Sequence, residues 1–417
     1  MQTENKSTLL VIIAALGYFV DIYDLVLFNV VKKESLEFIG LTGEALKKYD
    51  ISLFNWQMTG MLMGGLLWGI LGDKAGRIQV LFGSIILYSL ANLANAFVTN
   101  TDTYAICRIL AGIGLAGELG AGITLVVESM EKSKRGWGTM IIVTFGALGG
   151  VAARLVGGNG AELAAFFHLD IAAWQMAYIV GGVMGIMLLV LRVGAFESGM
   201  FHTMINSKVS RGNFFMLFST RKRTLTYLAS VVIGLPIWFV IGVLINQSHT
   251  LAAYIGVEGE VHVADSVMWS YIGLSVGDLI SGALSQWLKS RRKVIFIYLM
   301  ILALTVLFYV FNHHVSLDWF HFMCMMLGAS TGFWALFVTV ASEQFGTNLR
   351  STVTNTAPNF VRGATVPITK SFEGLIPLLG VGMAAISVGG VCILLSFLAT
   401  WYIKESFSKD LDYFELD

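Results

Sequence analysis

The chain consists largely of apolar runs of about twenty residues that follow one another with short polar breaks. A helix rises about 1.5 Å per residue, so roughly twenty apolar residues cross the ~30 Å hydrocarbon core of a bilayer. Such runs occur at 8–31, 51–72, 78–98, 104–128, 136–158, 172–193, 224–247, 264–288, 294–312, 317–341, 351–378 and 381–403. This pattern predicts an all-α integral membrane protein with twelve transmembrane helices.

Charged residues are scarce, at 13% of 417 residues, whereas soluble domains carry about 25%. The net charge is zero, so the overall balance indicates no nucleic acid partner. The three cysteines lie in apolar runs without the spacing of metal ligands, and the histidines form no i, i+4 pair on any span. We therefore expect no metal and no other cofactor. The first run contains two aspartates and no cleavage site, so it is read as a retained span.

The longest polar connection, 194–223, divides the spans into two groups of six. We therefore predict an N-terminal six-helix bundle in 1–193, a linker in 194–223, and a C-terminal bundle with a short tail in 224–417.

An internal repeat supports this division. A shift of 213 residues places Gly60, Gly64, Leu66, Gly69 and Leu71 on Gly273, Gly277, Leu279, Gly282 and Leu284. In each half, a glutamate precedes an arginine by seven residues at the inner end of the fourth span. These pairs are Glu128 with Arg135 and Glu343 with Arg350. Two pseudo-symmetric halves are typical of secondary transporters, which bind substrate between the halves near mid-membrane.

The Lys and Arg residues between spans indicate orientation. If the amino terminus is inside, the inner segments hold nineteen of these residues and the outer segments hold four. Positive residues concentrate on the cytoplasmic side, so both termini are predicted to be cytoplasmic. In a prokaryote the membrane would be the inner membrane. The remaining four cations lie within spans: Arg108, Arg154, Arg362 and Lys370.

The turn from Gly69 to Arg77 reads GILGDKAGR. It resembles the loop 2–3 motif G-x-L-x-D-[KR]-x-G-R of the major facilitator superfamily, and the E-x6-R pairs resemble those of its sugar-porter and metabolite:H+ symporter branches. Asp21-Ile-Tyr-Asp24 and the segment from Arg108 to Glu118 are most similar to the metabolite:H+ and phosphate:H+ symporters. The resemblance implies the major facilitator fold and proton-coupled transport.

Two positions depart from these motifs. Gln286 replaces the aspartate of the motif in the second half, which weakens the expectation of a symmetric inner gate. Leu119 and Gly120 stand where a proline usually follows the span 4 acid, which departs from the pattern of the symporter branches.

Three carboxylates are candidate proton-coupling groups. Asp21 and Asp24 lie one turn apart in the first span, roughly 20 to 25 Å from its inner end, and Glu118 lies near mid-membrane. A charge at such depth is costly and normally faces a cavity or a partner. Protonation removes the charge of a carboxylate, so these groups suit proton coupling, and the resemblance points the same way.

An anion site is predicted between the halves. Asn355, Asn359 and Arg362 follow i, i+4, i+7 spacing on one helix face, and Arg154 is a second deep guanidinium. Two guanidiniums facing each other across the cavity would bind carboxylates. The alternative is that Arg154 neutralises Asp21 or Asp24.

Other polar residues complete the predicted machinery. Six residues are candidates for lining the cavity, although aromatic residues on spans often only pack: Gln57, Tyr23, Trp238, Asn246, Gln247 and Trp334. Gating contacts at the inner surface are assigned to Asp73, Arg77, Glu128, Arg135, Glu343 and Arg350. Asp278 is expected to pair with a basic residue or to lie on a packed face, and Arg108 and Lys370 to extend toward the interfaces.

Together these features predict a monomeric secondary active transporter that moves a small organic anion by alternating access, coupled to protons. By resemblance, a di- or tricarboxylate such as citrate, alone or as a metal complex, is the first candidate substrate, and aromatic acids come next. A proton-driven exporter of drugs or siderophores and a phosphate or zwitterion symporter are the alternatives. An enzyme is not expected, because no nucleophile–base pair or metal cluster is apparent.

Overall fold

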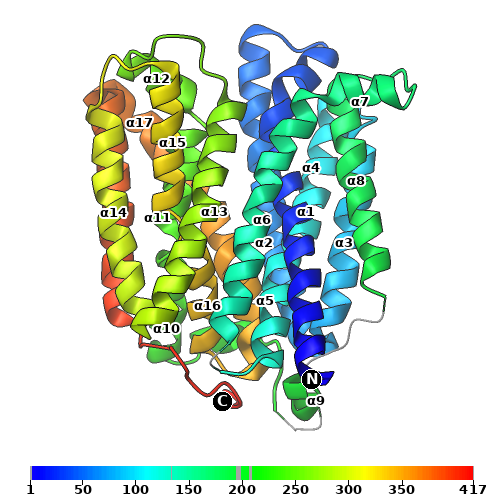
Figure 1. Cartoon of the computed structure of the whole chain (residues 1–417), viewed down its shortest axis with the longest axis vertical. Helices are drawn as coiled ribbons and strands as arrows, with labels where there is room; N and C mark the ends of the chain where they lie inside the picture. Colours follow the sequence, from blue (N-terminus) through cyan, green and yellow to red (C-terminus); the bar gives the residue numbers. More distant parts are fainter. Residues whose placement is uncertain (1, 133, 194–198, 206–208, 417) are drawn as a thin grey trace.

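The computed structural model describes residues 2–132, 134–193, 199–205 and 209–416. Residues 194–198 and 206–208 of the expected linker lie outside the described residues. The helices stand side by side, and both chain ends lie at one end of the bundle (Figure 1). We call that end the terminal face and the other end the opposite face.

The N-terminal half, drawn from blue to green-cyan in Figure 1, forms one side of the molecule. Its helices are α1 (Gln2–Phe38), α2 (Gly43–Ala75), α3 (Arg77–Asn95), α4 (Thr101–Leu115), α5 (Glu118–Ser129), α6 (Arg135–Gly158), α7 (Gly160–Phe166) and α8 (Ala173–Leu191). The fourth expected span is therefore divided into α4 and α5, and Glu118 is the first residue of α5.

The C-terminal half follows the short helix α9 (Gly199–Ile205). Its helices are η1 (Phe214–Phe218), α10 (Arg221–Val232), α11 (Leu235–Phe239), η2 (Val240–Ile245), α12 (Ser248–Ile255), α13 (Val263–Leu288), α14 (Arg291–Phe311), α15 (Leu317–Ser330), α16 (Trp334–Gln344) and α17 (Thr347–Tyr402). The tenth span is divided into α15 and α16, just as the fourth is divided, and η2 is a π-helical segment within the seventh.

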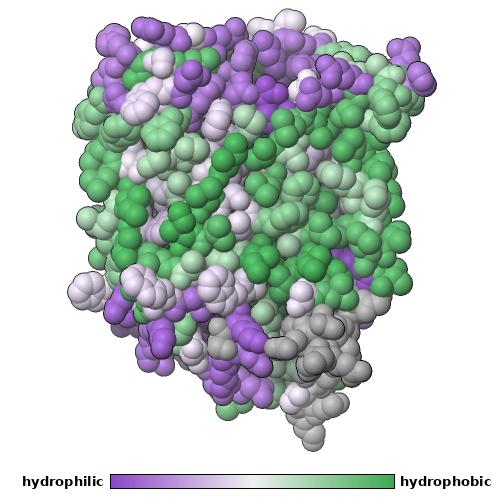
Figure 2. Space-filling view, viewed as in Figure 1, coloured by the Kyte–Doolittle hydropathy of each residue, from purple (hydrophilic) through white to green (hydrophobic). Residues whose placement is uncertain are grey.

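Ten helical segments among the described residues are long and apolar enough to cross a membrane. One of them, α17, comprises two helices that meet at Gly380, where the backbone is non-helical with φ 74°. The 33 residues of α2 supply the remaining crossing. The prediction of twelve transmembrane helices is thus confirmed. Figure 2 shows the matching surface, a broad hydrophobic belt between two hydrophilic ends.

Glycines allow the two halves to approach closely at α2 and α17. A methyl group at Gly65, Gly69 or Gly72 of α2 would press on Asn359, Thr352 or Ser351 of α17, respectively. These glycines recur at i, i+4 and i+7 and so share one face of α2. The second contact between the halves joins α6 to α13, where Ser275 Oγ donates to the Thr144 carbonyl over 2.8 Å.

The predicted repeat is visible in the packing. In the first half, methyl groups at Gly60 and Gly64 would overlap the carbonyl oxygens of Ile109 and Ile113. In the second half, Gly273 and Gly277 meet the carbonyl oxygens of Met325 and Ala329 in the same way. Both the glycines and the carbonyls they meet therefore recur at nearly constant separations along the chain.

The turn after α2 requires a glycine. Gly76 separates α2 from α3 and has φ 114° and ψ 154°, a conformation that side chains with a Cβ rarely adopt. It lets α3 begin at once with Arg77, which is completely buried. This short turn therefore carries an arginine into the contact between the halves.

Candidate functional site

A cavity of about 280 Å³ lies between the halves toward the opposite face. Lys32, Asp50, His249 and Glu373 contribute charged and polar groups to its wall. Below it is a chamber of about 10 Å³, large enough for a single water molecule. Asn29, Phe54 and Asn246 line both spaces, so the chamber continues the cavity inward.

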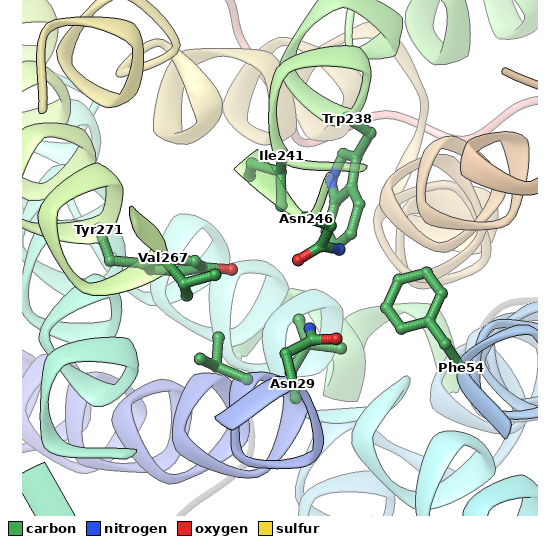
Figure 3. A pocket seen from close by; sticks show the side chains of 9 residues that line it. Asn29, Phe54, Trp238, Ile241, Asn246, Val267 and Tyr271 are labelled. Carbon is green, nitrogen blue, oxygen red and sulfur yellow. The ribbon is translucent and has the colours of Figure 1, made fainter. Parts of the chain in front are cut away.

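Both halves build the chamber. In Figure 3 the amides of Asn29 and Asn246 and the hydroxyl of Tyr271 gather around a common space, which the rings of Phe54 and Trp238 border. Asn29 and Phe54 come from α1 and α2, whereas the other three come from the C-terminal half. A rotation of one half against the other would therefore change the shape of the chamber.

Arg362 lies beside this chamber. Its guanidinium carbon is 5.9 Å from the ring centroid of Trp238 and 5.7 Å from that of Trp334, within the range of a cation–π contact. Its Nη2 is 3.8 Å from Oδ2 of Asp21, and both side chains are almost fully buried. Nε and Nη2 of Arg362 have no hydrogen-bond partner among the described residues, and neither do the two Asp21 oxygens. The pair is thus close enough for attraction but leaves donors and acceptors free.

Asn359 fixes the position of Arg362. Its Oδ1 accepts a hydrogen bond from Arg362 Nη1 over 3.2 Å, and its Nδ2 donates to the Ala116 carbonyl over 2.9 Å. Ala116 follows the last residue of α4, so the break in the fourth span provides the acceptor. Asn355, one turn earlier, donates to the Ser351 carbonyl over 2.8 Å, and its Oδ1 has no partner among the described residues.

The two span 1 aspartates have different surroundings. Asp21 approaches Arg362 of the other half, whereas Asp24 packs against Gly181 of α8 and is attracted by Arg108 of α4. Asp24 therefore faces the interior of the N-terminal bundle. Tyr23 does the same, because its hydroxyl donates to the Ala177 carbonyl over 2.8 Å. The expectation that Tyr23 lines the central cavity is not supported by this position.

The sequence predicted that Arg108 extends toward an interface, but the structure places it inside the bundle. It is fully buried, and it donates to the side-chain oxygens of Asn95 over 3.3 Å and Asn92 over 3.2 Å. Its guanidinium also lies 5.0 Å from the ring centroid of Tyr178. Polar side chains of the neighbouring helix α3 make this burial tolerable.

Glu118 forms a buried ion pair with Arg192, and both side chains are about 1% exposed. Arg192 follows the end of α8, and its Nη1 also donates to the Leu81 carbonyl over 3.1 Å. A methyl group at Gly17 of α1 would overlap both partners, so the pair packs directly against α1. Arg192 lies at the inner end of the predicted span 172–193, and its long side chain reaches inward to the acid.

Arg154 contacts Asp265, which was not among the site residues predicted from the sequence. Its Nε donates to Oδ1 of Asp265 over 2.6 Å, which joins α6 to α13 across the two halves. Both side chains are partly exposed. Arg154 therefore pairs with neither Asp21 nor Asp24, and in this conformation it and Arg362 have separate carboxylate partners. Asp265 lies near the start of α13, where it looked like an ordinary residue at a span end.

Trp334 and Asp278 meet at the break in the tenth span. Trp334 is the first residue of α16, and its Nε1 donates to the Tyr18 hydroxyl over 2.9 Å. Asp278 accepts a hydrogen bond from the backbone N–H of Ala335 over 3.0 Å. It therefore caps α16, a favourable place for a carboxylate. Gln57 is buried on α2, and its amide has no partner among the described residues.

A network of buried charges closes the terminal face between the halves. Oε1 of Glu128 accepts from Arg77 over 2.8 Å and from Arg350 of α17 over 3.0 Å. Asp73 of α2 accepts from the backbone N–H groups of Ser351 over 3.0 Å and Thr352 over 2.9 Å. We call Asp73, Arg77, Glu128 and Arg350 the terminal-face latch. Within it, α17 is bound to both α2 and α5.

The equivalent contacts in the second half differ. Arg291 reaches Glu343 over 3.4 Å, as Arg77 reaches Glu128, and Ser406 also donates to Glu343 over 2.6 Å. Arg135 instead donates to the carbonyls of Met130 over 3.2 Å and Lys409 over 3.4 Å. The residues of each E-x6-R pair thus have other partners, and the latch is asymmetric, in keeping with Gln286 in place of aspartate.

The described residues contain no group of three or more His, Cys, Asp or Glu side chains arranged to hold a metal ion. The described residues around Arg362 present one guanidinium, aromatic rings, amides and carboxylates.

Comparison with known proteins gives a consistent picture. A family model described as Major Facilitator Superfamily matches residues 12–363. A putative niacin/nicotinamide transporter, NiaP of Bacillus subtilis (strain 168), is 30% identical over 151 residues, which are 36% of each chain. A 3-(3-hydroxy-phenyl)propionate transporter of Escherichia coli (strain K12) is 29% identical over 262 residues, 62% of this chain and 61% of the relative. Both matches cover less than two thirds of the relative's length.

Among solved structures, the proton:xylose symporter XylE bound to 6-bromo-6-deoxy-D-glucose superimposes with a TM-score of 0.77 over 98% of both chains. Its sequence identity to this chain is 16%. At that identity the likeness establishes the fold alone.

Proposed function

The chain belongs to the major facilitator superfamily, and we propose that it carries a small aromatic carboxylate across the membrane together with protons. As a member of this family it is a multi-pass transporter of small metabolites, not an enzyme. The substrate class and the coupling to protons are our proposal, and they rest on the surroundings of Arg362.

The unsatisfied guanidinium of Arg362 is the observation that carries the proposal. Buried donors without partners are costly, so Nε and Nη2 are poised to bind an acceptor that enters from the chamber. A substrate carboxylate supplies two oxygens in the geometry that a guanidinium prefers. The rings of Trp238 and Trp334 both lie against the guanidinium and contact each other with centroids 6.4 Å apart, so they form an aromatic surface beside it that suits a planar apolar body.

Only one of the two predicted arginines is available to bind substrate, and this favours a monocarboxylate over citrate. The citrate hypothesis assumed that Arg154 and Arg362 both bind substrate, but Arg154 is already paired with Asp265. A tricarboxylate would then bring charges for which the described chamber residues offer no second cation. The relatives named as a putative niacin/nicotinamide transporter and a 3-(3-hydroxy-phenyl)propionate transporter support a small molecule with a ring, and niacin and the propionate are both acids.

Asp21 is the proposed link between protons and substrate. It attracts Arg362 from 3.8 Å without a hydrogen bond, so it competes with a substrate carboxylate for the same guanidinium. Protonation of Asp21 removes that competition and leaves Arg362 with a full positive charge for the anion. Glu118 is paired with Arg192, and Asp24 is attracted by Arg108, so we assign both carboxylates a role within the N-terminal bundle.

The proposed alternating access rests on contacts between the halves that lie at one end of the molecule. The terminal-face latch closes one end, and the cavity lies toward the other. Substrate enters from the opposite face, and the latch must separate before it leaves from the terminal face. The positive-inside pattern of Lys and Arg predicts that the terminal face is cytoplasmic, and with that orientation the proposed direction is uptake by a monomer.

Ligand binding to purified protein tests the proposal. Nicotinate, benzoate, citrate, phosphate and xylose are compared by the thermal shift that each produces, because a ligand of the native state stabilises it by mass action. We expect the two aromatic acids to raise the melting temperature and the others to leave it unchanged. A shift with citrate alone would overturn the monocarboxylate assignment.

Two arginine variants locate the site. Arg362→Gln should abolish the shift, whereas Arg154→Gln should preserve it, because Arg154 contacts Asp265 and not the chamber. Equal loss of the thermal shift in both variants would instead support the hypothesis that Arg154 and Arg362 bind the substrate together.

Proton coupling is tested separately in vesicles. Asp21→Asn mimics the protonated form, so it should still exchange labelled substrate across the membrane but no longer accumulate it under a pH gradient. Wild-type uptake that ignores the gradient would refute the coupling.

A further inference from the structure

A second cavity, of about 620 Å³, lies at the terminal face. Its walls come from the start of α10, the ends of α16 and α17, and the tail of residues 403–416, which has no helix. All of these elements belong to the C-terminal half, and the cavity shares no lining residue with the central cavity. The proposed transport mechanism makes no use of it.

Positive charge dominates this cavity. Its lining includes Lys222, Arg223, Lys404 and Lys409, but the only carboxylate among the described lining residues is Glu415. Arg223 forms an ion pair with that carboxylate, because its Nε lies 3.1 Å from Glu415 Oε2. Lys222 and Lys404 are exposed, and within the described chain neither forms an ion pair. The ammonium groups of Lys222 and Lys404 thus remain for an anion, and Lys409 adds a third positive charge to the wall.

Lys409 is held within the wall of the cavity. Its ammonium donates to the Glu343 carbonyl over 3.1 Å and to the Tyr413 hydroxyl over 3.0 Å. Burial lowers the pKa of Lys409, although the charge of Glu415 opposes this effect. A partly buried cation bonded to neutral acceptors gains from an anion nearby.

Aromatic residues place the cavity at the edge of the apolar belt. Tyr402, the last residue of α17, lines it, and the neighbouring Trp401 is 79% exposed. Exposed Trp and Tyr side chains concentrate where lipid headgroups meet the hydrocarbon. The belt in Figure 2 ends just above the terminal face, in agreement with this depth. An occupant of the cavity can therefore keep its acyl chains in the membrane.

We infer that this cavity binds the phosphate headgroup of an anionic phospholipid from the leaflet on the terminal face. The lysines supply charge to the phosphate, and Tyr402 marks the level at which the acyl chains begin. Basic pockets between transmembrane helices on the cytoplasmic side are suited to such headgroups. A free phosphate ion has the same charge chemistry but no reason to prefer this depth.

The site also bears on the terminal-face latch through the tail. The Leu411 carbonyl accepts from Arg350 over 2.6 Å, and the Tyr413 carbonyl accepts from the Thr347 N–H over 2.9 Å. Lys409 and Tyr413 line the cavity, so a bound headgroup holds the same tail that contacts the latch arginine. The lipid should therefore stabilise the conformation that is closed at the terminal face.

The test uses full-length purified protein without a transport substrate, so it does not depend on the proposed function. Delipidated protein is titrated with phosphatidylglycerol or phosphatidylcholine, and bound lipid is counted by native mass spectrometry. We expect preferential binding of phosphatidylglycerol. Lys222→Gln combined with Lys404→Gln should weaken it about thirtyfold, the effect of removing two charges near an anionic surface.

Lys293→Gln is the matched control, because Lys293 is an exposed lysine at the start of α14 that does not line the cavity. It should bind lipid as the wild type does. Equal weakening in the control and the double variant would mean nonspecific attraction and overturn the site. Inorganic phosphate forms the second arm, read by thermal shift. Stabilisation of the wild type by millimolar phosphate, lost in the double variant, would assign the site to a soluble anion and overturn the lipid proposal.

Discussion

The indole ring of Trp334 has two roles that can be separated. It lies 5.7 Å from the guanidinium carbon of Arg362 and donates its N–H to Tyr18. A cation–π contact in a dry site contributes about 2 kcal/mol. Trp334→Leu removes both interactions, so we expect affinity for an aromatic acid to fall by tenfold or more, roughly 1.4 kcal/mol per decade. Isothermal titration with nicotinate or benzoate measures the change.

Conservative variants distinguish the ring from its hydrogen bond. Trp334→Phe keeps an aromatic ring and loses the N–H, whereas Tyr18→Phe removes the acceptor and leaves Trp334 intact. If the ring matters most, both variants should bind nearly as well as the wild type. Affinity in Trp334→Phe as low as in Trp334→Leu, with Tyr18→Phe also weakened, would show that the hydrogen bond is the essential element.

Depth along a helix was predictable for single residues, but their partners were not. Asp21, Glu118 and Arg362 are buried, as counting from the span ends indicated. Their partners come from helices that are distant in the sequence. A long side chain can also place its charged group about one helix turn away from its own Cα. Arg192 illustrates this, because it follows the end of α8 and yet meets Glu118 inside the bundle.

At the scale of helices, close packing depends on particular glycines. A methyl group at Gly273 or Gly328 would overlap a backbone carbonyl of the facing helix, and backbone cannot move aside as a side chain does. Gly273→Ala should therefore destabilise the protein by about 1–3 kcal/mol, the usual cost of overpacking. Gly390→Ala is the control, because nothing lies within 4 Å of its position. Melting temperatures in one detergent compare the two, and equal values would refute the packing argument.

The tail is attached to α14 through Glu405. Its carboxylate accepts from Ser290 and from the backbone N–H groups of Arg291 over 3.0 Å and Arg292 over 3.2 Å. Burial raises the pKa of Glu405, but these hydrogen bonds outweigh it, so the pKa lies below its usual 4.5. The ionised form is therefore favoured in the folded state, and its stabilising effect is present above pH 4.5 and disappears as the pH falls through the lowered pKa.

Glu405→Gln should accordingly melt at a lower temperature than the wild type at pH 7, and the difference should shrink below pH 4.5. Melting curves at several pH values test this. A difference that stays constant from pH 7 to pH 4 would mean that the charge of Glu405 does not contribute.

The spans were predictable as elements because hydrocarbon thickness sets their length, but the breaks within them were not. The fourth span divides before Glu118 and the tenth before Trp334, and in both places the second helix starts with a residue of the central region. Glycines surround both breaks in the sequence, yet glycines are also frequent within unbroken spans, so composition alone did not locate them.

For the whole molecule, the distribution of contacts between the halves determines which conformation is stable. Glu128 holds Arg77 of its own half and Arg350 of the other, and all three side chains are fully buried. The sequence predicted that these residues form gating contacts, but the sharing of one carboxylate by two arginines depends on how α5 and α17 meet. Breaking a buried charge pair costs about 3–5 kcal/mol. Glu128→Gln should thus shift the population at least about tenfold toward opening at the terminal face.

Distances between spin labels measure that opening. Lys74 at the end of α2 and Lys293 at the start of α14 are exposed lysines in opposite halves, so Lys74→Cys and Lys293→Cys can carry labels once the native cysteines are replaced. Glu128→Gln should add a longer-distance population. Lys132→Gln is the control, because its pair with Asp410 is 50% and 67% exposed and contributes little. An unchanged distance distribution in a well-folded Glu128→Gln protein would mean that glycine-lined contacts between α2 and α17, and not the latch charges, keep the terminal face closed.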